Sequence, residues 1–212
     1  MSRLRIVCSL AAMTAASACQ TPPGAPRSVG PAVVVEEAED WRAIASPVDA
    51  AALDALPARW EQALAAGRAA KLSARIAAEG ALLQPDSALE RAVPTPGTYR
   101  CRYVRPGGRR WAASPPGYCY VGVAGGQLSL ATELRGLRLG GYLWEQKGGE
   151  RLIFLGALVG AGARMAAAYG EDPSKERAGR FERIGEFRYR LVLPEPSPGG
   201  LTVVDLVAAP RD

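Results

Sequence analysis

From Gly97 onward, apolar and polar residues alternate with a period of two, and glycines interrupt the alternation. This alternation is typical of strands with one buried face and one solvated face. Glycine-containing turns such as Gly125-Gly126 and Gly148-Gly149 separate several of the runs. The pattern predicts eight strands, at about 98–105, 117–124, 126–132, 138–146, 150–158, 177–184, 186–194 and 200–208.

The strand at 186–194 shows how the two faces differ. Tyr189 and Leu191 share one face, which predicts a dry side. Arg188 and Arg190 share the other, which predicts a wet side. Short connections favour a meander, and eight antiparallel strands commonly close on themselves because closure removes the exposed edges. We therefore expect an α+β fold, with a short N-terminal helical segment followed by an antiparallel, up-and-down barrel-like sheet of about eight strands.

Residues 46 to about 80 change to helical spacing. Ser46 is a suitable N-cap, and steps of three and four residues then place one apolar stripe along the helix. The stripe consists of Leu53, Leu56, Trp60 and Leu64. Pro57 predicts a kink or a split within it, and Gly67 predicts the end of this helix. A second, shorter helix should stop at Gly80. The stripe predicts a face packed on the rest of the domain, with Trp60 buried.

The N-terminus reads as an export signal. Two arginines precede a short apolar region at 6–16, which is too short to remain as a membrane anchor. Small residues at 16–18 then lead into Cys19. Residues 1–18 resemble a bacterial lipoprotein signal, in which the cysteine is lipidated and becomes the first mature residue. This resemblance implies attachment to a membrane through an N-terminal lipid.

The same residues also fit an ordinary cleavage site, because Ala16-Ser17-Ala18 matches the A-x-A pattern. That alternative predicts a soluble periplasmic or secreted protein and leaves Cys19 as an odd free thiol. Residues 19–39 are rich in proline and glycine, which predicts a flexible tether after the lipidated cysteine. By resemblance to sorting rules, Gln20 favours the outer membrane over the inner one.

Cysteine parity supports the lipid interpretation. Of the four cysteines, Cys8 leaves with the signal, and a lipidated Cys19 leaves Cys101 and Cys119 as a pair. An exported protein can form a disulfide, and these two cysteines lie on consecutive predicted strands. We therefore predict a Cys101–Cys119 bond that closes a loop of about 17 residues and contributes about 3 kcal/mol on a chain-entropy argument.

Charge and composition exclude several functions. The chain has 26 Lys+Arg and 21 Asp+Glu, and removing the two signal arginines leaves 24 − 21 = +3. This net positive charge is too small to indicate a nucleic-acid partner. The chain contains no histidine, which removes Ser-His-Asp and Cys-His hydrolases and His-ligated zinc. We expect no metal and no cofactor.

Carboxylate pairs remain as the only catalytic option. Glu171 and Asp172 lie in a predicted loop, and Glu182 lies on a predicted strand. Two carboxylates brought within about 5–9 Å could hydrolyse an envelope polymer. The plainer interpretation, which we favour, pairs Glu182 with a cross-strand arginine, either Arg188 or Arg190. The plainer interpretation leaves Glu171 and Asp172 as solvated turn residues.

A basic cluster follows the first predicted strand. It consists of Arg100, Arg102, Arg105, Arg109 and Arg110, with Trp111 beside them. The cluster could contact acidic headgroups or glycans, but a solvated strand face and hairpin explain it equally simply. The residues that could contact a ligand or a surface are therefore Arg100, Arg102, Arg109, Arg110, Trp111, Glu182 and Arg183.

The order of several short motifs resembles an uncharacterised bacterial secreted family, the domain-of-unknown-function family numbered 4893. The motifs include Asp40-Trp41-Arg42, Glu79-Gly80-Ala81-Leu82-Leu83, Gly97-Thr98-Tyr99-Arg100-Cys101-Arg102, Phe154-Leu155-Gly156 and Arg190-Leu191-Val192-Leu193-Pro194. The resemblance covers about residues 40–208. The resemblance implies export and the bounds of the domain. It does not imply any particular activity, because the family has no established one. The stretch 132–143 departs from the family pattern, and if it forms a ligand site, this chain has altered that site.

These observations predict a single domain over 40–212, helical over 40–90 and barrel-like over 97–210. We expect a non-catalytic binding or structural module in the cell envelope, whose partner is an envelope protein or a glycan. The alternatives are a carboxylate-dependent hydrolase of an envelope polymer and, by analogy with other small barrels, a proteinase inhibitor. A packed barrel interior would argue against the hydrolase, and a cleft with two close carboxylates would favour it.

Overall fold

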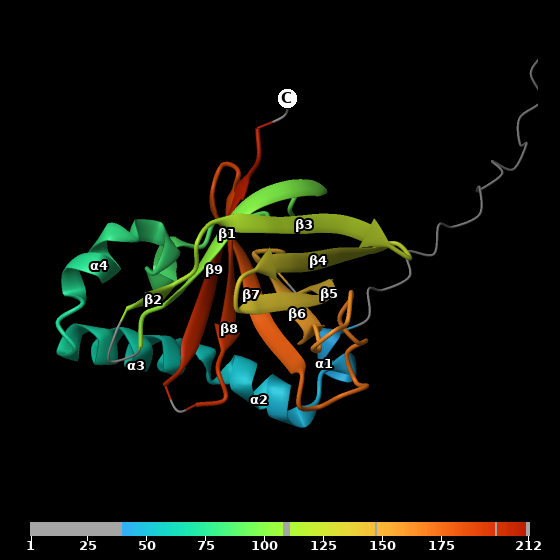
Figure 1. The fold of residues 1–212 in the computed structure, drawn as a ribbon, viewed down its shortest axis with the longest axis horizontal. Helices are drawn as coiled ribbons and strands as arrows, with labels where there is room; N and C mark the ends of the chain where they lie inside the picture. The colour runs from blue at the N-terminus through green and yellow to red at the C-terminus, as the bar shows by residue number, and fades with distance from the viewer. Residues whose placement is uncertain (1–39, 108–110, 147, 198, 211–212) are drawn as a thin grey trace, which may run out of the picture. The chain divides into compact units, whose positions relative to one another are not determined.

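The computed structural model describes residues 40–107, 111–146, 148–197 and 199–210 (Figure 1). The predictions for residues 1–39, including Cys19 and the tether, lie outside the described residues, as do Arg109 and Arg110. The helical part comprises α1 (Trp41–Ile44), α2 (Pro47–Asp54), α3 (Leu56–Ala69) and α4 (Ser73–Ala78), followed by the 3-10 turns η1 (Gly80–Leu82) and η2 (Pro85–Ser87).

Antiparallel strands follow the helices and close into an eight-stranded barrel. They are β1 (Gly97–Arg105), β2 (Ala112–Ala113), β3 (Gly117–Ala124), β4 (Gln127–Leu134), β5 (Leu137–Glu145), β6 (Arg151–Leu158), β7 (Glu176–Gly185), β8 (Arg188–Pro194) and β9 (Leu201–Ala208). Each barrel strand pairs with the next, and β9 pairs with β1 to close the ring. The extra strand β2 pairs with the end of β1 and was not predicted, because two residues are too few to show alternation.

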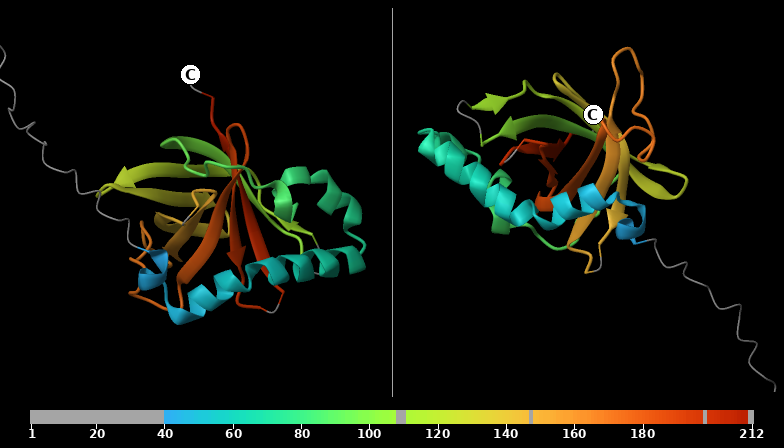
Figure 2. Two further views of the ribbon diagram at one scale, coloured as in Figure 1. Left: turned by 180° about the vertical axis from the view of Figure 1, so that it is seen from behind. Right: turned by 90° about the horizontal axis from the view of Figure 1, so that it is seen from below.

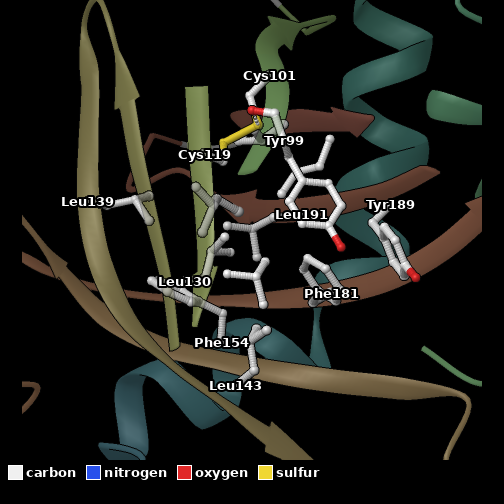
Figure 3. Packing of buried hydrophobic residues seen from close by; sticks show 14 of the residues in the cluster. Tyr99, Cys101, Cys119, Leu130, Leu139, Leu143, Phe154, Phe181, Tyr189 and Leu191 are labelled. Atoms are coloured by element: carbon white, nitrogen blue, oxygen red, sulfur yellow. Dashed lines mark hydrogen bonds between the residues drawn. A yellow bond between two sulfur atoms is a disulfide. The ribbon is translucent and has the colours of Figure 1, made fainter. Parts of the chain in front are cut away.

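Inward-facing side chains fill the barrel (Figure 3). Phe154 and Phe181 are fully buried at its centre. Tyr189 stacks on Phe181 with ring centroids 5.4 Å apart, and Tyr99 meets Tyr189 edge-on at 5.9 Å. An eight-stranded barrel has an interior just wide enough for its own side chains. The interior is therefore a packed core, as in a protein whose barrel serves as a scaffold.

The predicted disulfide joins Cys101 of β1 to Cys119 of β3, with the two Cα atoms 5.9 Å apart. The two cysteines are diagonal neighbours, because Cys119 lies opposite Tyr99 and Cys101 lies opposite Gly117. Both sulfurs are buried in the barrel core. The bond therefore ties two adjacent strands together from the inside.

We expect Cys101→Ser to lower the free energy of unfolding by about 3 kcal/mol, because the unfolded chain regains the entropy of an open loop. Chemical denaturation of the oxidised protein and of the variant measures this difference. Reduction of the wild-type protein should give a similar loss. A variant that is as stable as the oxidised protein would show that the bond contributes nothing.

The helices cover one outer flank of the barrel. In Figures 1 and 2, α2 and α3 lie end to end across β7, β8 and β9. The stripe residues Leu53, Leu56, Trp60 and Leu64 are all buried, which confirms that this face packs on the domain. Pro57 splits the helix as predicted, because α2 ends at Asp54 and α3 begins at Leu56.

Gly67 does not end α3, so that prediction is wrong. The helix continues to Ala69, and Gly67 is buried inside it. A Cβ atom at this position would lie 2.3 Å from the carbonyl oxygen of Pro106. Gly67 therefore allows the helix to approach the loop after β1 closely, which is a packing role and not a helix stop.

The prediction of a wet face on β8 is also wrong. The outer faces of β7, β8 and β9 are covered by the helices, and Arg190 is fully buried there. The alternation predicts the strand and its two faces correctly, but it cannot show whether solvent or another part of the chain covers the polar face. Here a second core, which includes Trp60 and Leu82, covers it.

Candidate functional site

The outer face of β3, β4 and β5 carries an exposed aromatic surface. Tyr118 and Tyr120 on β3 and Tyr142 on β5 each expose between 41% and 48% of their area. Aromatic side chains of this size are usually buried unless they contact something. Because α2 and α3 pack on β7 and β9, the outer face of β3, β4 and β5 is a candidate binding surface.

Small residues make the floor of this surface concave. Ala131 on β4 lies between Tyr120 on β3 and Gly140 on β5 in one cross-strand row. In the next row, Ser129 lies between Gly122 and Tyr142. The resulting groove has a volume of about 530 Å³. Its size is in the range of ordinary ligand clefts. We call it the tyrosine groove.

The segment between β6 and β7 forms one side of the tyrosine groove. Residues 164–169 of this segment line the groove, and Met165 is 80% exposed. Charged residues stand at the rim, where Glu133 and Arg138 are cross-strand neighbours. Arg138 donates from Nη2 to the carbonyl oxygen of Arg164 at 3.5 Å. The groove thus combines an apolar floor with a charged rim.

Tyr169 fastens this segment to the N-terminus of α2. Its hydroxyl accepts a hydrogen bond from the backbone N–H of Ser46 at 3.0 Å and donates to the carboxylate of Asp49. Burial, together with the hydrogen bond to Asp49, raises the pKa of Tyr169 to about 12. The hydroxyl therefore stays protonated at neutral pH and fixes one side of the groove.

A second hollow lies at the barrel end where β1 begins and β9 ends. Its volume is about 640 Å³, and its lining includes Tyr99, Phe187 and Ala208. Tyr99 forms its base, donating a hydrogen bond to the carbonyl oxygen of Thr95 at 2.6 Å. Tyr99 also belongs to the packed aromatic core, so the hollow lies at the end of the filled barrel.

The residues singled out from the sequence do not gather at one site. Arg100 is exposed on β1, whereas Arg102 is bound to Glu79 through two hydrogen bonds, one of them 3.0 Å long. Trp111 is half-buried and packs against the core beneath the helices. Arg183 donates from Nε to the carbonyl oxygen of Glu90 at 2.8 Å. Of the described members, Arg100 presents the most open side chain.

Glu182 belongs to a buried ion-pair network and has no exposed surface. Its Oε2 accepts from Nε of Arg190 at 2.7 Å, and its Oε1 accepts from Nε of Arg151 at 3.0 Å. The structure thus shows the cross-strand pair with Arg190 that the plainer interpretation predicted. Arg188, the other option, instead binds Asp205 through two hydrogen bonds of 2.8 and 3.0 Å.

These charges form a row across five neighbouring strands. Strand pairing places Arg151, Glu182, Arg190, Asp205 and Arg102 opposite one another in turn, from β6 to β1. Their signs alternate, so each carboxylate has an arginine on both sides. Charges on this face can be buried beneath the helices because they are paired.

A comparison with protein families agrees with the motif order found in the sequence. A family described as a domain of unknown function (DUF4893) matches residues 41–206. The chain belongs to the DUF4893 family. No curated protein and no solved structure is significantly similar to it. The family match therefore establishes membership, and any function must be argued from the site itself.

The described carboxylates of the DUF4893 domain are engaged in structural contacts where the sequence suggested catalysis. Asp172 accepts from Ser174 and pairs with Lys175 at 2.7 Å. These contacts lower the pKa of Asp172 to about 2, so it is not a general acid at neutral pH. Glu171 accepts from the backbone N–H of Ala168. Together with the buried Glu182, these residues act as loop and strand supports.

Two further properties of the DUF4893 domain concern its described residues only. The described residues contain no group of three or more Cys, Asp or Glu side chains placed to hold a metal ion. None of the described helices is long and apolar enough to cross a bilayer.

Sequence reasoning missed the tyrosine groove of the DUF4893 domain. The signal was present, because Tyr118, Tyr120 and Tyr142 occupy polar positions of the alternation. Large aromatic residues on a face predicted to be wet indicate a contact surface. Part of the groove also lies on the stretch 132–143, singled out from the sequence as a possible ligand site.

Proposed function

We propose that this DUF4893 protein is an exported, lipid-anchored envelope protein that acts as a non-catalytic binding module, with a protein partner seated in the tyrosine groove. The tyrosine groove carries the proposal: it is a concave, aromatic surface on the outer wall of β3, β4 and β5, whereas α2 and α3 pack on β7 and β9. The buried disulfide agrees with export, because such bonds persist in oxidising compartments.

Binding on the outer wall follows from how the barrel is filled. Its interior is packed with Phe154, Phe181 and the side chains around them, so a ligand cannot use it as ligand-binding barrels do. Catalysis is disfavoured because Asp172 and Glu182 are bound to cationic partners. An outer surface is then the part of the described chain best suited to recognition.

The residue types of the groove favour a protein partner over a glycan. Tyrosine, methionine and arginine are enriched at protein interfaces, and the groove presents all three. Tyr120 and Tyr142 flank a floor of Ala131 and Ser129, so an apolar side chain of the partner can insert between two rings. Central, water-excluded pockets of this kind supply most of the binding energy of an interface.

Site-specific cross-linking in the native cell tests the groove. A photoreactive phenylalanine analogue is placed at Tyr142 or at Met165, and at Val48 on α2 as a control that is as exposed as Met165. We expect the same protein adduct from both groove positions and none from Val48. Ala131→Trp should abolish the adduct, because the larger ring fills the floor without reaching the barrel core.

Adducts that form equally from Val48, or that persist in Ala131→Trp, would contradict a specific partner in the groove. An adduct only to polysaccharide would contradict the choice of a protein. Thermal unfolding of Ala131→Trp serves as the control for folding. Its midpoint should stay close to that of the wild type, because position 131 is on the outer wall.

The lipid anchor is tested at the mature N-terminus. Mass spectrometry should find a diacylglyceryl adduct on Cys19, because this cysteine follows small residues and precedes a proline-rich tether. Cys19→Ser should release the protein from membranes or stall its processing. An unmodified Cys19 terminus, as ordinary signal cleavage would give, would refute the anchor and leave the groove proposal untouched.

A further inference from the structure

A small cavity separates the N-terminal helices from the outer faces of β6 and β7. Its volume is about 180 Å³, and it shares no lining residue with the tyrosine groove. Three of its lining residues are arginines from different elements: Arg42 of α1, Arg151 of β6 and Arg180 of β7. Arginine is the residue that proteins use most often to bind carboxylate and phosphate groups.

The described carboxylates around this cavity are too few to balance its arginines. Glu182 alone serves Arg151, Arg180 and Arg190. Asp54, the other carboxylate, is bound by Arg42 through hydrogen bonds of 2.7 and 3.2 Å. The three lining arginines and the buried Arg190 therefore share two carboxylates, of which only Asp54 lines the cavity. This excess of positive charge sits in a partly buried place, where unbalanced charge is costly.

Arg190 and Arg180 differ in how fully they are satisfied. Arg190 donates to Glu182 and to the carbonyl oxygens of Ala81, Gln84 and Pro85 at 2.6–2.9 Å. Arg180, in contrast, approaches Glu182 only at 3.5 Å, although its side chain is just 15% exposed. Among the described residues, Arg180 thus has far fewer acceptors than its buried neighbour, and its guanidinium lines the cavity.

The surroundings of Arg180 also disfavour its charge. Burial is the main cause, and the nearby charge of Arg151 adds to it, so that the pKa of Arg180 is lowered from its usual value. An anion placed between the guanidinium groups of Arg180 and Arg151 would offset two unfavourable effects. These are the cost of burying the charge of Arg180 and the repulsion between the two arginines.

We propose that this cavity binds a phosphate group, with Arg180 and Arg151 as its main ligands and Arg42 approaching from α1. A tetrahedral oxyanion presents oxygens in several directions, which suits arginines that come from three different elements. The volume equals that of about six waters at about 30 Å³ each, which accommodates a phosphate and a few waters. The phosphate could be inorganic phosphate or the headgroup of an anionic phospholipid.

Thermal unfolding with inorganic phosphate as the probe tests the site. The mature chain carrying Cys19→Ser is unfolded in 20 mM phosphate (about 20 times a millimolar Kd) and in chloride at equal ionic strength. We expect a saturable rise in Tm of about 4–7 °C in phosphate only. Arg180→Gln should remove the rise. The matched control Arg100→Gln, an exposed arginine on β1, should keep it.

Arg42→Gln provides a second variant that does not depend on the buried network, because Arg42 is about half exposed. It should weaken phosphate binding several-fold while leaving the Tm in chloride nearly unchanged. No phosphate-specific rise in the wild type, or an equal rise in both pocket variants, would overturn the proposal. If Arg180→Gln does not fold, Arg42→Gln alone decides between these outcomes.

Vesicles distinguish the two sources of phosphate. The same chain is sedimented with vesicles of phosphatidylcholine, with and without phosphatidylglycerol. Binding that needs phosphatidylglycerol and is lost in Arg180→Gln identifies a lipid headgroup as the ligand. A phosphate-dependent Tm with no such vesicle binding identifies free phosphate or a soluble phosphate ester. Vesicle binding that Arg180→Gln leaves unchanged, with no phosphate effect on Tm, overturns the site.

Discussion

Glu182→Leu should destabilise the protein by about 3–5 kcal/mol, because among the described residues it removes the only carboxylate bound to the fully buried Arg190. The cost comes from the charge that is left behind. Arg190 would keep its hydrogen bonds to backbone carbonyls but lose its counter-charge, and Arg151 and Arg180 would lose their shared partner. Urea denaturation followed by circular dichroism measures the loss in free energy of unfolding.

Glu133→Leu is the matched control for this substitution. It makes the same chemical change on the outer face of β4, at an exposed position. Its effect should stay within about 0.5 kcal/mol, as for most surface substitutions. If Glu182→Leu were no more disruptive than Glu133→Leu, the charge row would not hold the helices on the barrel.

Trp60→Ala should destabilise the protein by a similar amount, about 3–5 kcal/mol, through the cavity that it leaves beneath α3. Trp60 is buried, and its indole N–H donates to the carbonyl oxygen of Leu83 at 3.2 Å. Trp60→Phe should cost less, because it keeps most of the ring and loses mainly the hydrogen bond. Tyr142→Ala, an exposed aromatic, serves as control and should change stability little.

The effects of Glu182→Leu and Trp60→Ala should not add. The guanidinium of Arg190 lies over the Trp60 ring at 4.5 Å and also binds Glu182, so both substitutions disturb the same group. Groups that share a partner couple by about 0.5–3 kcal/mol. A double variant whose loss equals the sum of the single losses would show that helix packing and the charge row act independently.

The strands could be predicted from the sequence because a strand with one buried face leaves a period-two pattern. All eight barrel strands were predicted within two residues of their ends. The disulfide followed from cysteine parity and the order of the strands. The helix stripe was found because Leu56, Trp60 and Leu64 repeat at helical spacing.

The covering of the charged face could not be predicted from that pattern. Arg190 was predicted to lie on a solvated face, because alternation records polarity and not what lies above a polar face. The structure buries both Arg190 and its partner Glu182. Their burial depends on a cover from a distant part of the sequence, because Arg190 binds the backbone carbonyls of Ala81 and Gln84, more than a hundred positions earlier. Gly67 was misread for a related reason, since its close approach to Pro106 is a contact between distant segments.

The candidate site was harder to foresee than the fold. A groove arises where small residues on one strand lie between large ones on its neighbours, which requires the register of three strands. The sequence held Tyr120, Ala131 and Tyr142, but only the register brings them together. Likewise, Arg42 and Arg180 are 138 positions apart and share a cavity only because the helices fold back over β7.

We propose that the filled barrel acts as a scaffold and that recognition takes place on its outer wall. Hydrogen exchange of the protein, alone and bound to the partner identified by cross-linking, tests this claim most directly. We predict protection confined to β3–β5 and to residues 159–169. Protection centred on the barrel end around Tyr99 and Phe187, with β3–β5 unchanged, would contradict the claim.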